Sequence, residues 1–176
     1  MRNYSASFLQ DDLATELSKI LDGMLLPDPD GNRIPINIFK QWLPVQSAQE
    51  LPEGITDEAL EGGSYAAKEQ QDPFPFVLVR LMQGTIKEPN SAQQVDIALI
   101  IGVIDRGYEN QGHKDVLNII QKIHERFAKN QILAHGYECV YPMDWFMQDE
   151  ESWPYFYGSV ALKFETVPIR REDPFT

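Results

Sequence analysis

The chain has 176 residues, and a typical domain has roughly 150, so the sequence predicts a single domain over 1–176. Its 15 basic and 27 acidic residues give a net charge of −12, which argues against tight binding to nucleic-acid phosphates or an anionic membrane. Apolar residues make up 43% of the chain, as in folded globular proteins. The longest apolar run, Ile97–Ile104, is far shorter than the ~20 residues that span a bilayer.

The start of the chain predicts an amphipathic helix. Residues 1–5 lead directly into it without the apolar core of a signal peptide, so we expect a mature cytoplasmic start. Between Phe8 and Met24, apolar residues recur at helical spacing: Leu9, Leu13, Leu17, Ile20, Leu21 and Met24. Ser7, followed by Gln10, resembles a capping box, and Gly23 is a candidate helix end.

A turn and a strand follow this helix. Residues 27–32, Pro-Asp-Pro-Asp-Gly-Asn, have the composition of a tight turn. Beyond them Ile34, Ile36 and Ile38 alternate with other residues, which predicts a strand. Pro35 within it favours a position at the edge of a sheet.

Residues 45–73 differ in character from the rest of the chain. Seven acidic residues, Glu58 and Glu61 among them, face one lysine, so this segment carries 1 − 7 = −6, half of the net charge. Loops longer than about 12–15 residues in a compact domain are usually functional or disordered. We therefore expect a long acidic loop that is either a mobile arm or an interaction loop.

Two strands are predicted after the acidic loop. The first covers residues 76–82 and ends at Gly84, and the second covers 94–104. In the second strand one face is wholly apolar and the other becomes apolar toward Ile104. A strand with two apolar faces must be covered on both sides, so we expect helices on one side and a second sheet or a partner subunit on the other.

The remaining elements complete the predicted fold. A helix is expected over 112–129, with Asn130 as a left-handed stop, followed by strands at 136–141 and 156–165. This order predicts an α+β fold: an antiparallel or mixed β-sheet with two main α-helices packed on one face and the long acidic loop as an insertion.

Patterns that could bind a metal ion are incomplete. Asp28, Asp30 and Asn32 match the first positions of a calcium loop, but Arg33 and Phe39 stand where its glycine and closing glutamate belong, so a plain turn is predicted. The histidines at 113 and 124 would lie about 16 Å apart along a helix, too far apart to share an ion. The third, at 135, is in a loop, and we predict no metal and no cofactor.

Patterns for catalysis are equally weak. The single cysteine, Cys139, excludes an internal disulfide, fits a reducing compartment and is expected to be a buried, inert thiol. The acidic run Asp149-Glu150-Glu151 is expected in a wet turn between two strands. A carboxylate-based hydrolase using Asp144, Asp149 or Glu151 stays an alternative, because glycoside hydrolysis needs two such groups in one cleft. The sequence therefore predicts no catalytic residue.

Aromatic residues are densest between 145 and 157. Flat rings of this kind are common at protein interfaces. The candidate interaction residues are these aromatic side chains together with two acids of the loop: Trp145, Phe146, Trp153, Tyr155, Tyr157, Glu58 and Glu61. We expect part of this stretch in the core and part at a partner contact.

The block from Asp72 to Pro168 resembles a known family. It comprises the Pro-Phe-Pro-Phe-Val-Leu-Val-Arg strand at 73–80, the Val-Asp-Ile-Ala-Leu-Ile-Ile-Gly-Val strand at 95–103, the helix at 115–127 and the Tyr-Phe-Tyr-Gly-Ser-Val-Ala-Leu-Lys-Phe strand at 155–164. With the opening helix and the Ile-Pro-Ile-Asn-Ile strand at 34–38, it is similar to the tail terminator (tail completion, minor tail) proteins of long-tailed bacteriophages and prophages.

The resemblance implies a non-enzymatic structural protein of the virion tail, assembled in the host bacterial cytoplasm. Members form a hexameric ring that caps the tail tube and provides the docking surface for the head or neck. The implied partners are further copies of the chain, the tail-tube protein and head or neck connector proteins, with DNA passing the lumen without tight binding. Three alternatives stay open: another head–tail connector, a bacterial adaptor that uses the acidic loop, and the small hydrolase.

Overall fold

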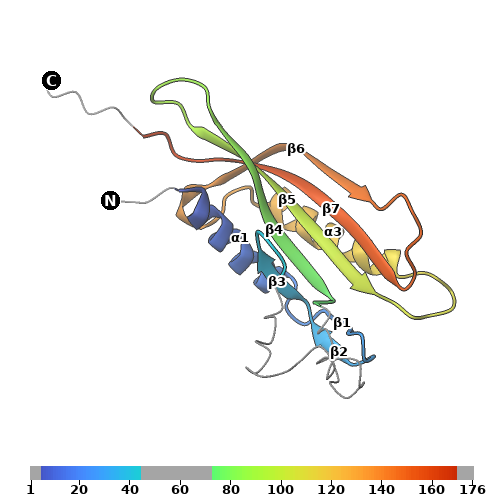
Figure 1. Cartoon of the computed structure of the whole chain (residues 1–176). Helices are drawn as coiled ribbons and strands as arrows, with labels where there is room; N and C mark the ends of the chain where they lie inside the picture. The colour runs from blue at the N-terminus through green and yellow to red at the C-terminus, as the bar shows by residue number, and fades with distance from the viewer. Residues whose placement is uncertain (1–4, 45–72, 170–176) are drawn as a thin grey trace, which may run out of the picture.

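The computed structural model describes residues 5–44 and 73–169 (Figure 1). The five-stranded sheet has the order β3-β4-β5-β7-β6, and only the β3–β4 pair is parallel. A separate two-stranded sheet pairs β1 with β2. The elements in chain order are α1 (Ala6–Ile20), β1 (Leu25–Pro27), β2 (Arg33–Pro35), β3 (Asn37–Lys40), β4 (Phe76–Ile86), β5 (Gln93–Ile104), α3 (His113–Lys129), the 3-10 turn η1 (Ala134–Gly136), β6 (Glu138–Met147) and β7 (Tyr155–Glu165).

Both helices lie on one face of the large sheet, behind it in the view of Figure 1. Helix α1 contacts β3 and β4, whereas α3 contacts β5 and β7. Between them the buried stripes of the two helices meet the inward side chains of the strands, which include Val77 and Val79 from β4 and Ile97, Leu99 and Ile101 from β5. The predicted α+β fold with a mixed sheet and two helices on one face is thus confirmed.

The first helix begins earlier and ends earlier than predicted. Ser5, not Ser7, is the N-cap, and its hydroxyl accepts a hydrogen bond from the Phe8 N–H at 3.5 Å. The helix ends at Ile20, and Gly23 follows with a φ of 77°, which glycine adopts without steric cost. The predicted apolar stripe is correct, because Leu9, Leu13 and Leu17 are fully buried.

The single strand predicted around Ile34–Ile38 is wrong. Residues 33–35 form β2, which pairs antiparallel with the unpredicted β1, whereas residues 37–40 form β3, which pairs in parallel with β4. Pro35 ends β2 because it has no N–H to continue the ladder. One short alternating run therefore belongs to two sheets, with β3 at the edge of the large one.

Three later boundaries also differ from the prediction. Strand β4 does not stop before Gly84; a register shift at Met82 lets it continue to Ile86. Strand β6 runs to Met147, well past the predicted end at 141, through a second register shift between Val140 and Asp144. Asn130 has an extended backbone with φ −153°, and the left-handed residue lies further on, at His135 with φ 61°.

The second face of the sheet is closed at one end by the chain's own aromatic rings. Phe74, Phe76, Leu78 and Ile104 are buried together there. A Cβ on Gly102 would lie only 2.4 Å from the Phe76 ring, so the missing side chain is what allows this ring to lie on β5. At this position the expected second sheet or partner subunit is replaced by residues of the same chain.

Candidate functional site

The predicted aromatic residues gather at one end of the large sheet, where β6 ends and β7 begins. Trp145, Phe146 and Trp153 are about half exposed, and Tyr157 lies at the border of exposure. Tyr155 instead packs on Phe74, with ring centroids 4.9 Å apart, and belongs to the buried cluster of the second face. Glu58 and Glu61 lie outside the described residues.

A pocket of about 380 Å³ opens at this end, between α3 and β6. We call it the α3–β6 pocket. Its lining combines apolar and aromatic side chains with carboxylates and amides, which we call its rim. The lining residues are Asn110, His113, Leu117, Trp145, Met147, Gln148, Asp149, Glu150, Glu151, Phe156 and Tyr157. The structure therefore brings the acidic run and two of the predicted aromatic residues to one cavity.

The pocket exists because α3 covers β7 but not β6. A Cβ on Gly158 would lie 2.5 Å from Cγ1 of Val116, so the helix packs directly on the backbone of β7. At the start of α3, the Phe156 ring fills the space next to Gly112 in the same way. Trp145 and Met147 on β6 lie in register with Val160 and Gly158, on the helix side of the sheet, where α3 packs mainly on β7.

The loop between β6 and β7 is held by its own hydrogen bonds. The Gln148 side-chain oxygen accepts from the Tyr157 N–H at 2.6 Å, and its amide donates to the Glu150 carbonyl at 2.8 Å. The Ser152 hydroxyl donates to the Tyr155 carbonyl at 2.8 Å. Because these bonds determine the path of the backbone, the three acidic residues are presented at the pocket rim by an ordered turn, as the sequence predicted for a wet loop.

The electrostatic environment at this end is negative. No lysine or arginine is among the pocket residues, and Asp149, Glu150 and Glu151 are exposed. Near the start of α3, burial raises the pKa of Asp115; the charge of Asp105 raises it further and that of Arg33 lowers it. The Asn110 amide donates to Glu151 at 2.8 Å, while its buried Oδ1 accepts no hydrogen bond from the described residues. Such a rim favours a cationic group over an anionic one.

The carboxylates of the hydrolase alternative are only partly brought together. Asp149 and Glu151 both border the pocket, whereas Asp144 lies on the opposite face of β6, in register with Ala161. Both rim carboxylates stand in solvent, so burial does not distinguish an acid from a base as glycoside hydrolysis requires. The arrangement suits electrostatic binding better than acid–base chemistry.

The other reactive residues lie away from the pocket or on its wall. Cys139 is buried on β6, and burial raises the pKa of its thiol to about 11, which makes it a poor nucleophile. Asp28 accepts the N–H groups of Asp30 and Asn32 at 2.9 and 2.8 Å, as in the predicted turn. Across the described residues, no group of three or more His, Cys, Asp or Glu side chains is placed to hold a metal ion.

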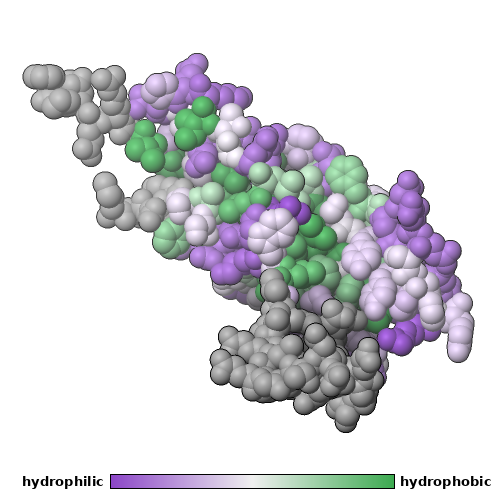
Figure 2. Space-filling view, viewed as in Figure 1, coloured by the Kyte–Doolittle hydropathy of each residue, from purple (hydrophilic) through white to green (hydrophobic). Residues whose placement is uncertain are grey.

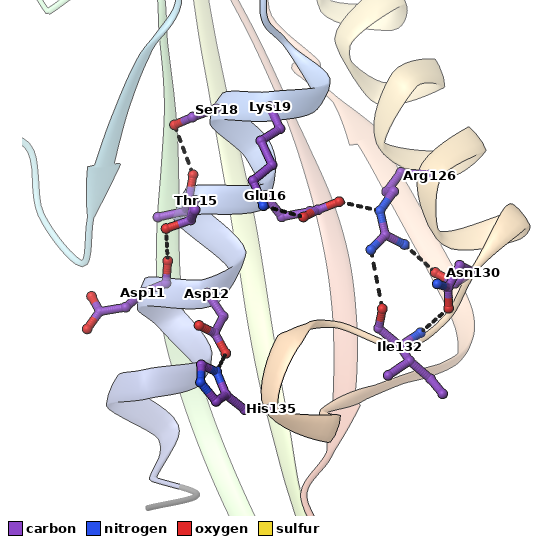
Figure 3. A network of polar contacts seen from close by, with 11 residues as sticks. Asp11, Asp12, Thr15, Glu16, Ser18, Lys19, Arg126, Asn130, Ile132 and His135 are labelled. Carbon is purple, nitrogen blue, oxygen red and sulfur yellow. Dashed lines mark hydrogen bonds and ion pairs between the residues drawn. The ribbon is translucent and has the colours of Figure 1, made fainter.

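On the opposite side of α3, a polar network fills the junction with α1 (Figure 3). Arg126 of α3 pairs with Glu16 of α1, and its guanidinium also donates to the carbonyls of Asn130 and Ile132. Asp12 of α1 contacts His135 of η1 at 2.7 Å. Side chains of α1, α3 and η1 are thus joined by polar contacts on this side of the helix layer.

Sequence reasoning found the aromatic and acidic residues of this end but missed the rest of the pocket wall. Leu117 and Asn110 have no distinctive sequence context, since one sits in an amphipathic helix and the other in a loop. Phe74 and Phe76, which cover the second face, were visible as aromatic residues but could only be assigned to a strand. Their partners come from β5 and β7, far along the chain.

Comparison with models of known protein families gave no match, and a search of curated proteins also found none. No helix in the described parts of the chain, residues 5–44 and 73–169, is long and apolar enough to cross a membrane.

Proposed function

We propose that the chain is a structural subunit of a bacteriophage or prophage tail, similar to a tail terminator, that assembles head to tail into a hexameric ring. The ring caps the tail tube and presents a docking surface for head or neck connector proteins. The protein acts in the virion tail, after assembly in the cytoplasm of the host bacterium.

The main support is a pair of unlike apolar surfaces at opposite ends of one sheet. The aromatic end consists of the exposed Trp145, Phe146, Trp153 and Tyr157. The hairpin end, where β4 turns into β5 and β7 finishes, consists of the exposed Met82, Ile86, Val167 and Ile169. Figure 2 shows hydrophobic residues at that end, near the exit of the chain toward its C-terminus.

Two unlike surfaces at opposite ends favour heterologous contacts, in which one end of a copy meets the other end of the next. Contacts of this kind build rings when the rotation closes and filaments when it does not. Isolated exposed apolar residues are common on monomers, but side chains as exposed as Ile86 at 63% and Ile169 at 79%, grouped in one place, are typical of interaction sites.

The charge of the chain fits the same proposal. A net charge of −12 makes the surface of each copy repulsive to the phosphates of DNA. In a ring the repulsion would let DNA pass through the lumen without being held. We expect the assembled protein to show no retention of duplex DNA at physiological salt.

The proposal is tested by native mass spectrometry and light scattering over a concentration series, with electron microscopy of the largest species. We expect a closed ring of six copies and termination of tube growth when the protein is added to polymerising tail-tube protein. A chain that stays monomeric at all concentrations, with tail-tube protein present, would contradict it. A filament without closure would contradict the ring while keeping the head-to-tail contact.

A further inference from the structure

The chemistry of the α3–β6 pocket identifies the kind of group that fits it. Its floor is apolar, with Leu117, Met147 and the Trp145 ring, and its rim is acidic. An arginine side chain matches both parts, because its aliphatic stem packs on apolar surface while its guanidinium pairs with carboxylates and stacks on aromatic rings. A neutral apolar group would leave the charged rim unpaired, and an acidic group would be repelled by it.

The chain itself carries a matching segment. Arg170 and Arg171 are the only two adjacent basic residues in the sequence. They follow directly after Ile169, which is exposed at the hairpin end together with Val167. The segment thus offers two cations preceded by apolar residues. Glu172 and Asp173 follow them, so the match to the apolar floor and acidic rim of the pocket lies in residues 167–171.

The pair cannot reach the pocket of its own copy. Strand β7 separates the two: it starts at the pocket with Tyr155 and its 11 residues extend about 36 Å at roughly 3.3 Å each before the chain reaches Thr166. Arg171 is two residues beyond Ile169, a reach of at most about 7 Å. Figure 1 likewise shows the chain leaving toward its C-terminus at the end of the sheet opposite to the β6–β7 loop.

We propose that the α3–β6 pocket binds Arg170 and Arg171 of a second copy of this chain. The contact would join the hairpin end of one copy to the aromatic end of the next, with Val167 and Ile169 packing near Trp145. It rests on the head-to-tail association proposed above and names the residues that make it specific. Asp149 and Glu150 supply the pairing charges, since Glu151 already accepts from Asn110.

Charge reversal tests the contact in the full chain. We expect Arg170→Glu/Arg171→Glu to raise the dissociation constant for self-association at least about tenfold, because close charge pairs at interfaces couple strongly. Asp149→Lys/Glu150→Lys should weaken association similarly. Combining all four changes should restore association to within about threefold of the wild type. Light scattering and native mass spectrometry measure all three variants.

A matched control separates the contact from a general charge effect. Lys122→Glu/Lys129→Glu changes the net charge by the same amount as the arginine variant, at exposed positions of α3 away from the pocket lining. Its association should stay within about threefold of the wild type. An equal loss in this control, or no rescue in the fourfold variant, would overturn the proposal.

A second measurement remains decisive if the chain does not self-associate. A peptide of residues 167–176 is added to the full chain and followed by tryptophan fluorescence and by NMR of the indole N–H groups. Binding that shifts the Trp145 signal and is lost in Asp149→Lys/Glu150→Lys supports the docking contact, even if the ring fails. No binding of the peptide overturns the docking contact. If the arginine variant also associates like the wild type, the ring proposal stays intact.

Discussion

Helix α3 has two sides, and they are built in opposite ways. On the side of α1, Arg126, Glu16 and the residues after α3 form a connected polar network over a core of large side chains. On the side of β6, the helix packs down on β7 through Gly158, and Trp145 and Met147 line the open α3–β6 pocket. The first side serves stability and the second leaves space for a ligand or partner.

The difference shows how a two-layer fold can keep a binding site without weakening its core. Two helices cover β3, β4, β5 and β7, and the edge strand β6 is the part left over. Cys139 at the start of β6 is buried, whereas Trp145 near its end is about half exposed. One strand therefore passes from core to pocket wall along its length, and substitutions on the two sides of α3 should have different consequences.

The largest effect is expected on the closed side. Phe127 is fully buried, packs edge-on against Phe164 with ring centroids 5.7 Å apart and lies under the Arg126 guanidinium. Phe127→Ala should lower the free energy of unfolding by about 3–5 kcal/mol through lost burial and a residual cavity. Urea unfolding followed by circular dichroism measures this. A loss below about 1 kcal/mol would mean that the core closes differently from the structure.

Breaking the network at Arg126 should cost less. Arg126→Ala removes a guanidinium whose side chain is only 19% exposed and leaves the carbonyls of Asn130 and Ile132 without this donor, for which about 1.5–3 kcal/mol is expected. A double-mutant cycle with Glu16→Ala should show a coupling above about 0.5 kcal/mol. Lys122→Ala on the exposed face of the same helix is the control, and it should change stability by less than about 0.5 kcal/mol. Additive single effects would argue against a connected network.

The close contact between α3 and β7 predicts the next effect. Gly158→Ala places a Cβ 2.5 Å from Val116 Cγ1, and this short side chain cannot move far, so a loss of about 1–3 kcal/mol is expected from overpacking. The same unfolding experiment applies. If the variant is as stable as the wild type, α3 is free to shift, and the width of the α3–β6 pocket is then not set by this contact.

The buried end of β6 predicts a pH effect. Burial raises the pKa of the Cys139 thiol from its ordinary value of 9.0 to about 11. Its contribution to stability is complete well below pH 9 and is lost as the pH rises toward 11, because the unfolded chain ionises first. At pH 10 the loss is on the order of 1 kcal/mol. The pH dependence of unfolding between 8 and 10.5 should be shallower in Cys139→Ala. Identical slopes in both proteins would contradict this burial.

The smallest effect on stability is expected on the open side. Trp145 is 54% exposed, so Trp145→Ala should change the free energy of unfolding by no more than about 0.5–1 kcal/mol. Self-association should nevertheless weaken severalfold, because the ring forms part of the proposed contact. A large loss of folding stability without any effect on association would reverse the roles assigned to the two sides of α3.

The features of the fold that could be predicted are those that depend on residues close together in the sequence. Strands β5 and β7 and helix α3 were found because their apolar residues repeat at a local period that is preserved in the fold. The division of residues 33–40 between two sheets was missed, since it depends on pairing of β3 with β4, across the acidic loop. The N-cap at Ser5 and the bulges of β4 and β6 depend on tertiary packing and strand register, which composition does not reveal.

The candidate site divides in the same way. The aromatic and acidic residues between 145 and 157 stand close together in the sequence, so their shared location was predictable, but Tyr155 turned inward to Phe74 while Trp145 stayed at the surface. The alternation of β7 determines which residues share a face. Which face of the sheet is covered depends on where the helices pack, and this packing cannot be predicted from a local sequence pattern.

The sequence by itself determined a folded, strongly acidic chain with amphipathic helices, alternating strands and an aromatic segment next to carboxylates, because charge and periodicity are properties of neighbouring residues. Only the tertiary structure decided that α3 lies on β7 and not on β6, which opens the α3–β6 pocket. It also decided that the pocket and Ile169, the last described residue, lie at opposite ends of the sheet. The length and direction of β7 determine this separation. Both depend on the pairing of β7 with β5 and β6, and β5 is distant from β7 in the sequence.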